Sequence, residues 1–324
     1  MDDISDVIFD DSLSDWSFFS EPDDYPQSVN IDLSNGSPLD KNDFIVVHFN
    51  IDSILAEGRI EQLSDVCRSM GVDCLVLTES KLDDSVPNNL LKINNFHDPL
   101  RKDRNRHGGG CLVYVAEYLT FNQIKKFQSN KYEHLWVNIN CNNKIYSINA
   151  LYRPSTDNTA DKYEEFLNES EIILTNLKNH KSDIKIIASD LNFGNVYCKQ
   201  PILLPKPLDN AAPELYASFG FKQLIDIPTR VRENTISLVD LFFVSCIDTV
   251  KSHGTLPPIA DHDGIFTSFL SVKTQYKPVK RTVYDYKNAN EQGLLKHISE
   301  YDYTTSVFFY TSISTSRSAL WHTN

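Results

Sequence analysis

The chain has 324 residues, of which 41% are hydrophobic and 23% charged, a composition typical of a globular protein that buries a substantial core. Its formal net charge is −13, but residues 1–43 hold twelve Asp and Glu against one Lys, so the remainder carries only −2 and neither favours nor excludes a polyanionic ligand. The six cysteines form no CxxC pair and no apolar run is long enough to span a bilayer, which excludes a zinc finger and a membrane span and predicts reduced thiols.

Residues 1–43 are rich in Asp, Ser, Asn and Pro, a composition typical of a disordered acidic tail. A solubilising leader is the simpler interpretation, and a short partner-binding motif around the aromatic residues of DWSFF is the alternative. The acidic start MDDISDVIFDD lacks the basic residues and the apolar run of a secretory signal. We therefore expect a protein of the nucleus or cytoplasm that is not secreted.

Order is expected to begin at residue 44, where the apolar, β-branched run Phe44–Phe49 predicts a buried strand. Residues 54–70 carry apolar side chains at helical spacing, and Gly71 predicts the end of that helix. DCLVLTES follows as a second buried strand. A strand–helix–strand unit of this kind favours parallel pairing and an α/β fold class.

Residues 80–109 predict an irregular segment, which contains the basic run RKDRNRH and three glycines. GCLVYVAEYL, HLWVNIN and KIYSINALYRP are predicted as strands joined by short polar links, which suggests antiparallel hairpins. Residues 160–179 predict an amphipathic helix, a short helix is expected near residues 215–219, and further strands are expected in DIKIIASDLN, FKQLIDIP, TISLVDLFFVS and GIFTSFLSV. The pattern weakens after residue 272, so we expect one domain over residues 44–272 and a linker with a truncated continuation over residues 273–324.

Five short islands place polar side chains at the ends of these apolar runs. They are HFNID, LTES, ALYRP, SDLN and the pair SLVDLFF with ADHDG. Strands that all carry polar groups at one end converge on one edge of a sheet, so residues distant in sequence can form one site. Carboxylates, two amides, a phenol and an imidazole suit a hard divalent cation and a phosphodiester.

The carboxylates of these islands are candidate metal ligands, because Mg²⁺ prefers oxygen and usually takes one or two carboxylates from a protein. Glu79 is the first candidate, with Asp52, Asp190 and Asp261 as further ones. Any single Asp after a strand is more often a turn residue or a helix cap, and that alternative stays open for each.

Asp190, together with three neutral side chains, also predicts hydrolytic chemistry. Asp190 could hold and deprotonate a water, while Asn192, two residues on, could orient that water or a phosphate oxygen. Asn50 could position a phosphate, and Tyr152 could donate its phenol to a non-bridging or leaving oxygen. Without its partners, each of these is better explained as a structural polar residue.

His262 lies just before a predicted strand, and Asp240 lies on another. A carboxylate partner raises the pKa of an imidazole and keeps it protonated near neutrality, so we predict that Asp240 orients a cationic His262 that polarises a phosphate oxygen. Arg104 and Arg230 in predicted basic loops, and Arg153, are candidates for phosphate contacts. A solvated surface explains the two loops equally well.

In this order the islands resemble the motifs of the endonuclease/exonuclease/phosphatase superfamily over about residues 44–271, with ALYRP similar to the Tyr motif of its abasic-endonuclease branch. RKDRNRHGGGCLVYV, IPTRVRENTISLVDLFF and KRTVYDYKNAN further resemble the endonuclease domain of non-LTR retrotransposons. The resemblance implies a four-layer α/β sandwich, in which two mixed β-sheets pack face to face between helices. It also implies dependence on Mg²⁺, with Mn²⁺ as the alternative cation.

The resemblance further implies an endonuclease that nicks DNA and leaves a 3′-hydroxyl for reverse transcription, with a reverse transcriptase domain in a full-length parent but none in this chain. Ser189 replaces the usual Gly of the GDxN motif and Ala260 the usual Ser of the SDH motif. The extra bulk at residue 189 lies where backbone could approach a phosphate. Two alternatives stay open, namely a host abasic-site nuclease or phosphoesterase of the same superfamily, and an inactive retroelement remnant.

Overall fold

A computed structural model of the protein describes residues 28–32, 39–129, 131–157, 159–193, 210–232, 235–271 and 290–300. The chain divides into two units, Met1–Tyr276 and Lys277–Asn324. The first unit contains the β-sheets, and in the second the structure describes one helix, α4 (Glu291–Glu300). Within these ranges no helix has both the length and the hydropathy to cross a membrane. The aromatic residues of DWSFF lie outside the described residues.

A seven-stranded sheet has the order β1-β14-β15-β2-β3-β5-β4. Its parallel pair β2–β3 is joined through α1, which ends at Gly71 with φ 71°, as the helical spacing and the glycine predicted. The bounds are β1 (Val29–Asn30), β2 (Phe44–Asn50), α1 (Arg59–Met70), β3 (Cys74–Thr78), β4 (Leu100–Lys102), β5 (Cys111–Val115), β14 (Val250–Leu256) and β15 (Gly264–Phe269).

A six-stranded sheet has the order β10-β13-β9-β8-β7-β6. The β7–β8 hairpin turns at Asn142 and Asn143, with φ 51° and 62°, the left-handed pair that a tight two-residue hairpin turn requires. The bounds are β6 (Thr120–Ile124), β7 (Glu133–Cys141), β8 (Lys144–Tyr152), β9 (Ile184–Asp190), β10 (Lys222–Gln223) and β13 (Asp240–Val244). The parallel pair β8–β9 is joined through helix α2 (Ala160–Lys178).

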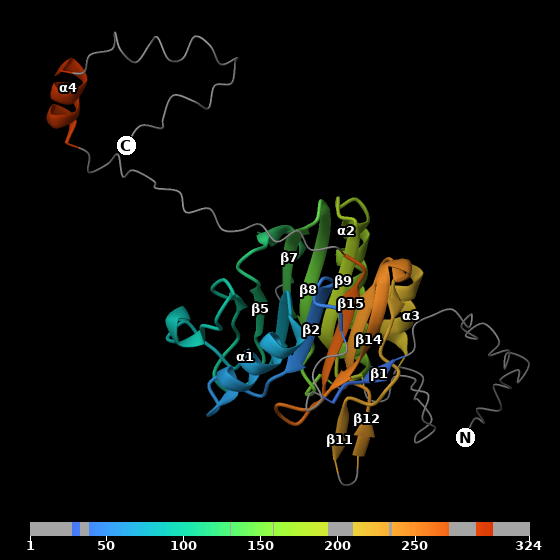
Figure 1. Ribbon diagram of the computed structural model, residues 1–324. Helices are drawn as coiled ribbons and strands as arrows, with labels where there is room; N and C mark the ends of the chain where they lie inside the picture. Colours follow the sequence, from blue (N-terminus) through green and yellow to red (C-terminus); the bar gives the residue numbers. More distant parts are fainter. Residues whose placement is uncertain are drawn as a thin grey trace, which may run out of the picture. The chain divides into compact units, whose positions relative to one another are not determined.

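Smaller elements complete the first unit. A separate two-stranded hairpin, β11–β12, projects from the body (Figure 1). The remaining bounds are β11 (Arg230–Arg232), β12 (Thr235–Ser237), the helix α3 (Ala211–Ser218) and the 3₁₀ turns η4 (Asn88–Leu91), η5 (Lys125–Phe127) and η6 (Ile247–Thr249).

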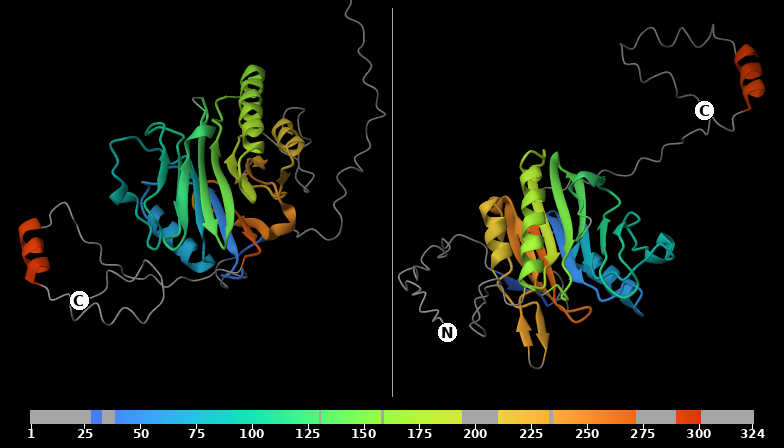
Figure 2. Two further views of the ribbon diagram at one scale, coloured as in Figure 1. Left: turned by 90° about the horizontal axis from the view of Figure 1, so that it is seen from above. Right: turned by 180° about the vertical axis from the view of Figure 1, so that it is seen from behind.

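The two mixed sheets pack face to face, and helices cover both outer faces, as the predicted four-layer sandwich requires (Figures 1 and 2). Alternate residues of β2 point to opposite sides, because side chains alternate along a strand. Phe44 and Val46 lie in the core between the sheets, where the ring of Phe44 stacks on Tyr146 of β8 with centroids 4.1 Å apart. Ile45 and Val47 belong to the second core, under α1. Helices α2 and α3 cover the other sheet (Figure 2).

Three predictions about the elements need correction. Part of the predicted tail is folded, because β1 pairs with β14 and Asp43 is buried in an ion pair with Lys251, 2.8 Å away. The predicted hairpin between GCLVYVAEYL and HLWVNIN is wrong, since β5 pairs with β3 and β4 while β7 pairs with β6. The mostly polar strand β14 was not predicted.

Candidate active site

The polar islands meet at one edge of the sandwich. Asn50 and Thr78 are register partners at the ends of β2 and β3, and Tyr152 and Asp190 are partners at the ends of β8 and β9. Strand β13 runs antiparallel to β9, so Asp240 at its start lies opposite Asp190. Pairing register therefore aligns two of the five islands at the end of one sheet and the other three at the end of the second sheet.

A hydrogen-bond network joins the two sheets there. The Asn50 amide donates to Asp190 Oδ2 at 2.8 Å and to Glu79 Oε1 at 3.2 Å, and the Tyr152 hydroxyl donates to the same Glu79 oxygen at 3.0 Å. Asn50 is the last residue of β2 in one sheet, whereas Tyr152 and Asp190 belong to the other. Burial, and next the charge of Glu79, raise the pKa of Tyr152, so its phenol stays a donor.

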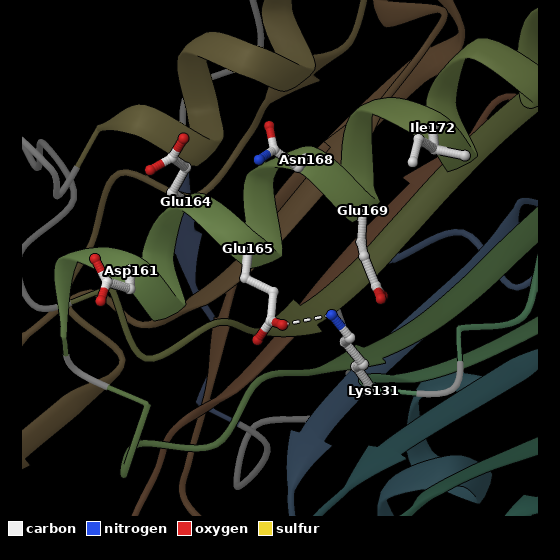
Figure 3. Close-up of a pocket in the computed structure, with 7 residues that line it drawn as sticks. All are labelled: Lys131, Asp161, Glu164, Glu165, Asn168, Glu169 and Ile172. Atoms are coloured by element: carbon white, nitrogen blue, oxygen red, sulfur yellow. Dashed lines mark hydrogen bonds and ion pairs between the residues drawn. The ribbon is translucent and has the colours of Figure 1, made fainter.

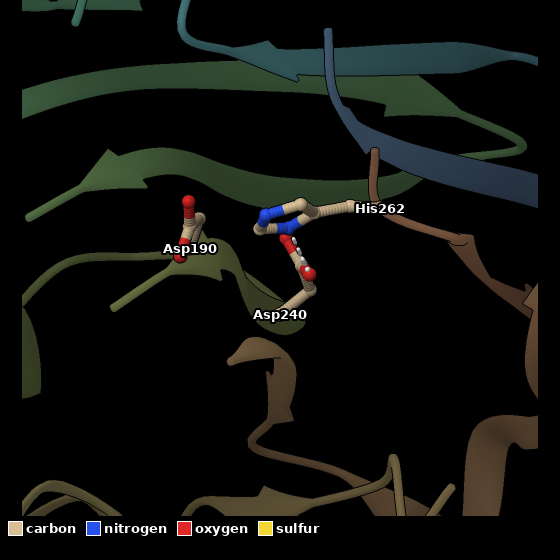
Figure 4. Close-up of side chains that lie close together, drawn as sticks. All are labelled: Asp190, Asp240 and His262. Carbon is tan, nitrogen blue, oxygen red and sulfur yellow. Dashed lines mark hydrogen bonds and ion pairs between the residues drawn. The ribbon is translucent and has the colours of Figure 1, made fainter. Parts of the chain in front are cut away.

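Asp190, Asp240 and His262 form a buried cluster, with one ligand atom of each within 4.8 Å of the others (Figure 4). His262 Nδ1 lies 2.8 Å from Asp240 Oδ2. Burial alone would lower the pKa of His262, but the charge and hydrogen bond of Asp240 raise it to about 9. The cluster can hold a metal only if the imidazole is neutral, and this pairing favours imidazolium.

Burial and the charge of Asp240 raise the pKa of Asp190 to about 8, against the opposing effects of His262 and the Asn50 amide. This carboxylate is fully buried and can exchange a proton near neutral pH. It also accepts the backbone amide of Asn192 at 3.2 Å. A group with these properties suits proton transfer from a water molecule.

A second imidazole, His48, lies on the other side of Asp240 and was not predicted. Its Nδ1 is 3.9 Å from Asp240 Oδ1, and its Nε2 is 3.1 Å from the Thr78 hydroxyl. Burial lowers the pKa of His48 to about 4, so this ring is neutral. Because His48 precedes Asn50 by two residues on one strand, alternation could have placed both on the same face.

Asp52 and Glu79 share a cation. The Lys81 ammonium contacts an oxygen of Asp52 and lies 3.7 Å from Glu79 Oε2. Asp52, Glu79 and Lys81 all have positive φ, of 43°, 53° and 53°, which L-residues rarely adopt outside constrained sites. An ammonium between two carboxylates is a stand-in for a metal ion, so these residues fit the predicted divalent cation.

Asp261 and Arg230, predicted as a metal ligand and a phosphate contact, pair with each other. Arg230 Nη2 donates to Asp261 Oδ2 at 3.0 Å, and Arg232 contacts the same oxygen. Burial raises the pKa of Asp261, but the charges of His262 and the two arginines outweigh it, and the pKa is lowered. Asp261 Oδ1 is also 3.9 Å from His262 Nε2, so the β11–β12 hairpin reaches the site through this residue.

The prediction that Arg153 contacts DNA is wrong, because its side chain is fully buried. Its guanidinium donates to the carbonyls of Leu191, at 2.9 Å, and of Asp157, and it stacks on two aromatic rings. Asn192 donates its side-chain amide to the Arg153 carbonyl at 3.0 Å and has φ 50°. Arg153 and Asn192 therefore hold together the loops that follow β8 and β9.

An acidic hollow of about 420 Å³ lies along α2 (Figure 3). Glu165 there pairs with Lys131, while Asp161, Glu164 and Glu169 add further carboxylates. Carboxylates repel phosphate, so this face is unsuited to nucleic acid.

Comparisons with known proteins agree with the architecture. No protein-family model matches the chain, and no curated protein matches it. Among solved structures, the 3′–5′ exonuclease NExo from Neisseria meningitidis matches at 14% identity and a TM-score of 0.55, covering 70% of this chain and 99% of that one. The endonuclease domain of TRAS1, a telomere-specific non-LTR retrotransposon, matches at 13% identity and 0.52, covering 70% and 98%. The AP endonuclease LMAP from Leishmania major matches at 12% identity and 0.55, covering 76% and 92%. At these identities the likeness is one of fold.

Proposed function

We propose that this chain, which has the fold of the endonuclease/exonuclease/phosphatase superfamily, is a divalent-metal-dependent DNA endonuclease. The observation that carries the proposal is the Asn50 amide, which ties Glu79 and Asp190 together across the two sheets. It supports the proposal because the proposed cation ligand Glu79 and the proposed base Asp190 are then neighbours, and His262 lies in the same cluster as Asp190. A hydrogen bond that served only the stability of the core would not explain why a carboxylate pair, a buried Asp and an imidazole lie together.

Glu79 and Asp52 would hold Mg²⁺ or Mn²⁺ in place of the Lys81 ammonium. A divalent ion bound there would act as a Lewis acid that withdraws charge from a phosphoryl oxygen. Glu79 is fixed by donors from Asn50 and Tyr152 on one oxygen, which leaves its other oxygen for the ion. Asp261, predicted as a third ligand, stays a prediction because the structure pairs it with arginines.

The protein's own groups divide the remaining work. Asp190 accepts the proton of the attacking water, whose oxygen forms a bond to phosphorus while the P–O3′ bond breaks. The departing O3′ takes a proton from a solvent water and becomes the 3′-hydroxyl, and the phosphate stays on the 5′ side. The His262 imidazolium, oriented by Asp240, donates to a non-bridging oxygen and offsets its growing charge. Tyr152 and Asn50 supply further neutral donors, with Tyr152 able to donate to the leaving oxygen.

The sequence flanking the motifs favours a retroelement enzyme, whose nick would prime reverse transcription on target DNA. A reverse transcriptase would then use the 3′-hydroxyl, and the enzyme would act in the nucleus or, before import, in the cytoplasm. The fold likeness to the TRAS1 domain supports this source. DNA as the partner is also supported by NExo, described as a 3′ phosphatase, whose structure was solved bound to a product DNA hairpin.

Supercoiled plasmid tests the proposal directly. With Mg²⁺ we expect the full chain to convert it to nicked circles, and EDTA or the single variants Asp190→Asn and His262→Ala to reduce the rate at least 100-fold. Glu165→Gln, on the acidic face of α2, is the matched control and should nick normally. Nicking confined to abasic DNA would make the protein a repair nuclease, and no nicking by any folded preparation would make it an inactive remnant.

A further inference from the structure

The guanidinium of Arg104 is held at the edge of the site by three different groups. Its Nε donates to the Gly108 carbonyl at 2.9 Å, and its Nη1 lies 3.4 Å from Glu133 Oε1. Its central carbon lies 5.5 Å from the centre of the Tyr152 ring. A long side chain with a carbonyl, a carboxylate and an aromatic face around it is fixed in direction rather than free in solvent.

Glu133 is an unusual residue for its position. It begins β7 directly opposite Tyr152, and only 6% of its surface is exposed. Its Oε2 is buried and accepts no hydrogen bond within the described part of the chain. Burial raises the pKa of Glu133 against the stabilising charge of Arg104. A buried carboxylate that is only partly satisfied is costly, which indicates a role that an apolar residue could not fill.

Two glycines lie against the side chain of Arg104, and a third lies against Ser80. A Cβ on Gly109, which has φ 69°, would lie 2.5 Å from the guanidinium carbon of Arg104, and one on Gly108 would lie 2.9 Å from Nη2. A Cβ on Gly110 would lie 2.4 Å from the Ser80 hydroxyl. The amide of Lys81 donates to the Gly109 carbonyl at 2.9 Å, so the glycine segment is tied to the residues that follow Glu79.

Arg101, on the preceding strand β4, shows the contacts of an arginine with a purely structural role. Its guanidinium donates to the carbonyls of Val86 and Asp83 and pairs with Asp103, and 16% of its side chain is exposed. Arg104 keeps 33% of its side chain exposed, and within the described residues no hydrogen bond uses its Nη2. It therefore retains an unused donor, Nη2, on a guanidinium whose central carbon lies 5.5 Å from the Tyr152 ring.

We propose that Glu133 is a positioning residue, which with the Gly108–Gly110 segment directs the free edge of Arg104 to a phosphodiester oxygen of the substrate strand beside Tyr152. This inference rests on the proposed nuclease function and names a phosphate contact within it. Arg104 binds the phosphate, and Glu133 acts only through Arg104. The fork of a guanidinium suits two oxygens of one phosphate, which an ammonium cannot contact in the same way.

Duplex binding tests this apart from catalysis. A fluorescein-labelled 20-base-pair duplex is titrated with the full chain in EDTA, at several salt concentrations, and followed by anisotropy. We expect Arg104→Gln to weaken binding about tenfold and to reduce the slope of log K against log salt by about 0.9, the value for one lost phosphate contact. Glu133→Gln should weaken binding about threefold, and Arg104→Lys should fall between wild type and Arg104→Gln.

The double variant separates positioning from structural damage. If Glu133 acts through Arg104, the double variant Glu133→Gln/Arg104→Gln binds as Arg104→Gln does, because the second change has nothing left to misplace. Arg68→Gln, on an exposed arginine of α1, and Glu165→Gln are the matched controls and should bind as wild type does. In plasmid nicking, Glu133→Gln should raise KM and leave kcat within about twofold.

Additive losses in the double variant, or wild-type binding by Glu133→Gln at an unchanged melting temperature, would overturn the positioning role. A wild-type chain that neither binds duplex nor nicks plasmid would instead remove the nuclease function on which the inference rests. Urea unfolding of each variant shows whether a loss of binding comes from a loss of stability. If Glu133→Gln is unstable, Glu133→Asp replaces it. We expect partial binding by Glu133→Asp, because it keeps the negative charge.

Discussion

At the scale of single residues, the pairing of His262 with Asp240 makes stability depend on pH. The pKa of His262 is raised to about 9 in the folded protein, against about 6.5 in an unfolded chain. The protonated ring therefore stabilises the fold fully below pH 6.5, and this contribution is lost as the pH rises through about 9.

We expect the free energy of unfolding, measured in urea, to fall between pH 6.5 and pH 9.5, and Asp240→Asn to flatten that fall. Asp190, whose pKa burial raises to about 8, contributes with the same sign, so Asp190→Asn is measured beside it. An unchanged pH slope in the Asp240→Asn protein would show that this carboxylate does not hold the imidazolium.

The same scale shows which site residues the sequence could predict. Asp190, Tyr152 and Asn50 were predictable because each ends an apolar strand, and parallel strands bring such ends together. Arg153 was assigned wrongly, since its residue type suggested phosphate binding while its guanidinium turns into the interior. Glu133 was missed because it precedes the apolar run HLWVNIN, where an acidic residue normally marks the solvated start of a strand.

At the scale of elements, β1 is held on the edge of β14 by a glycine and one apolar anchor. Gly254 is the register partner of Val29, and a Cβ there would lie 1.7 Å from the Val29 carbonyl oxygen. Ile31, just after β1, is 3% exposed and donates its amide to the Thr255 carbonyl at 3.0 Å.

We expect Ile31→Ala to lower the free energy of unfolding by ~2 kcal/mol and Gly254→Ala by ~1–3 kcal/mol. The double variant should lose less than the sum, because both changes release the same strand. Urea unfolding measures all three, with the exposed Val231→Ala as a control that should change stability by less than ~0.5 kcal/mol. Fully additive losses would mean that β1 does not depend on Gly254.

Elements with a strong pattern were predicted and weakly patterned ones were not. The apolar strands β2, β3 and β9 and the periodic helix α2 have close to their predicted bounds. Helix α1 ends where predicted but begins at Arg59, whereas the predicted start was residue 54. Strand β14 alternates too little to be recognised, because its middle residues Lys251 and Ser252 are polar. An irregular segment precedes β5, and the local sequence does not specify with which strands β5 pairs after that segment.

At the scale of the whole molecule, a divalent ion should stabilise the first unit. An ion that binds only the folded state at a hundredfold excess over its Kd adds ~2.7 kcal/mol, which for a domain of this size raises Tm by about 5–10 °C. We expect Mg²⁺ to raise the Tm of wild type, but not of Glu79→Gln, in a thermal melt. Lys81→Met should reach the same rise at lower Mg²⁺, because no ammonium competes. An equal rise in Glu79→Gln would place the ion elsewhere.

The whole fold was predictable as an α/β sandwich because the order of motifs carries more information than any one of them. The boundary of the predicted tail was not, because the acidic composition of residues 1–43 is a property of the segment, whereas Ile31 and Asp43 join the core as individuals. The average composition of a segment does not show which single residues within it are buried in the folded domain.

The ring stack of Phe44 on Tyr146 joins the same two strands, β2 and β8, that carry Asn50 and Tyr152 farther along. The geometry of the candidate site is thus set several residues away from its polar groups, by aromatic side chains that lie outside the motifs. A related sequence that keeps every polar motif but loses this aromatic contact would have all the polar site residues, but the two strands that carry Asn50 and Tyr152 would no longer be aligned. Interior substitutions are therefore the better measure of whether a diverged copy still works.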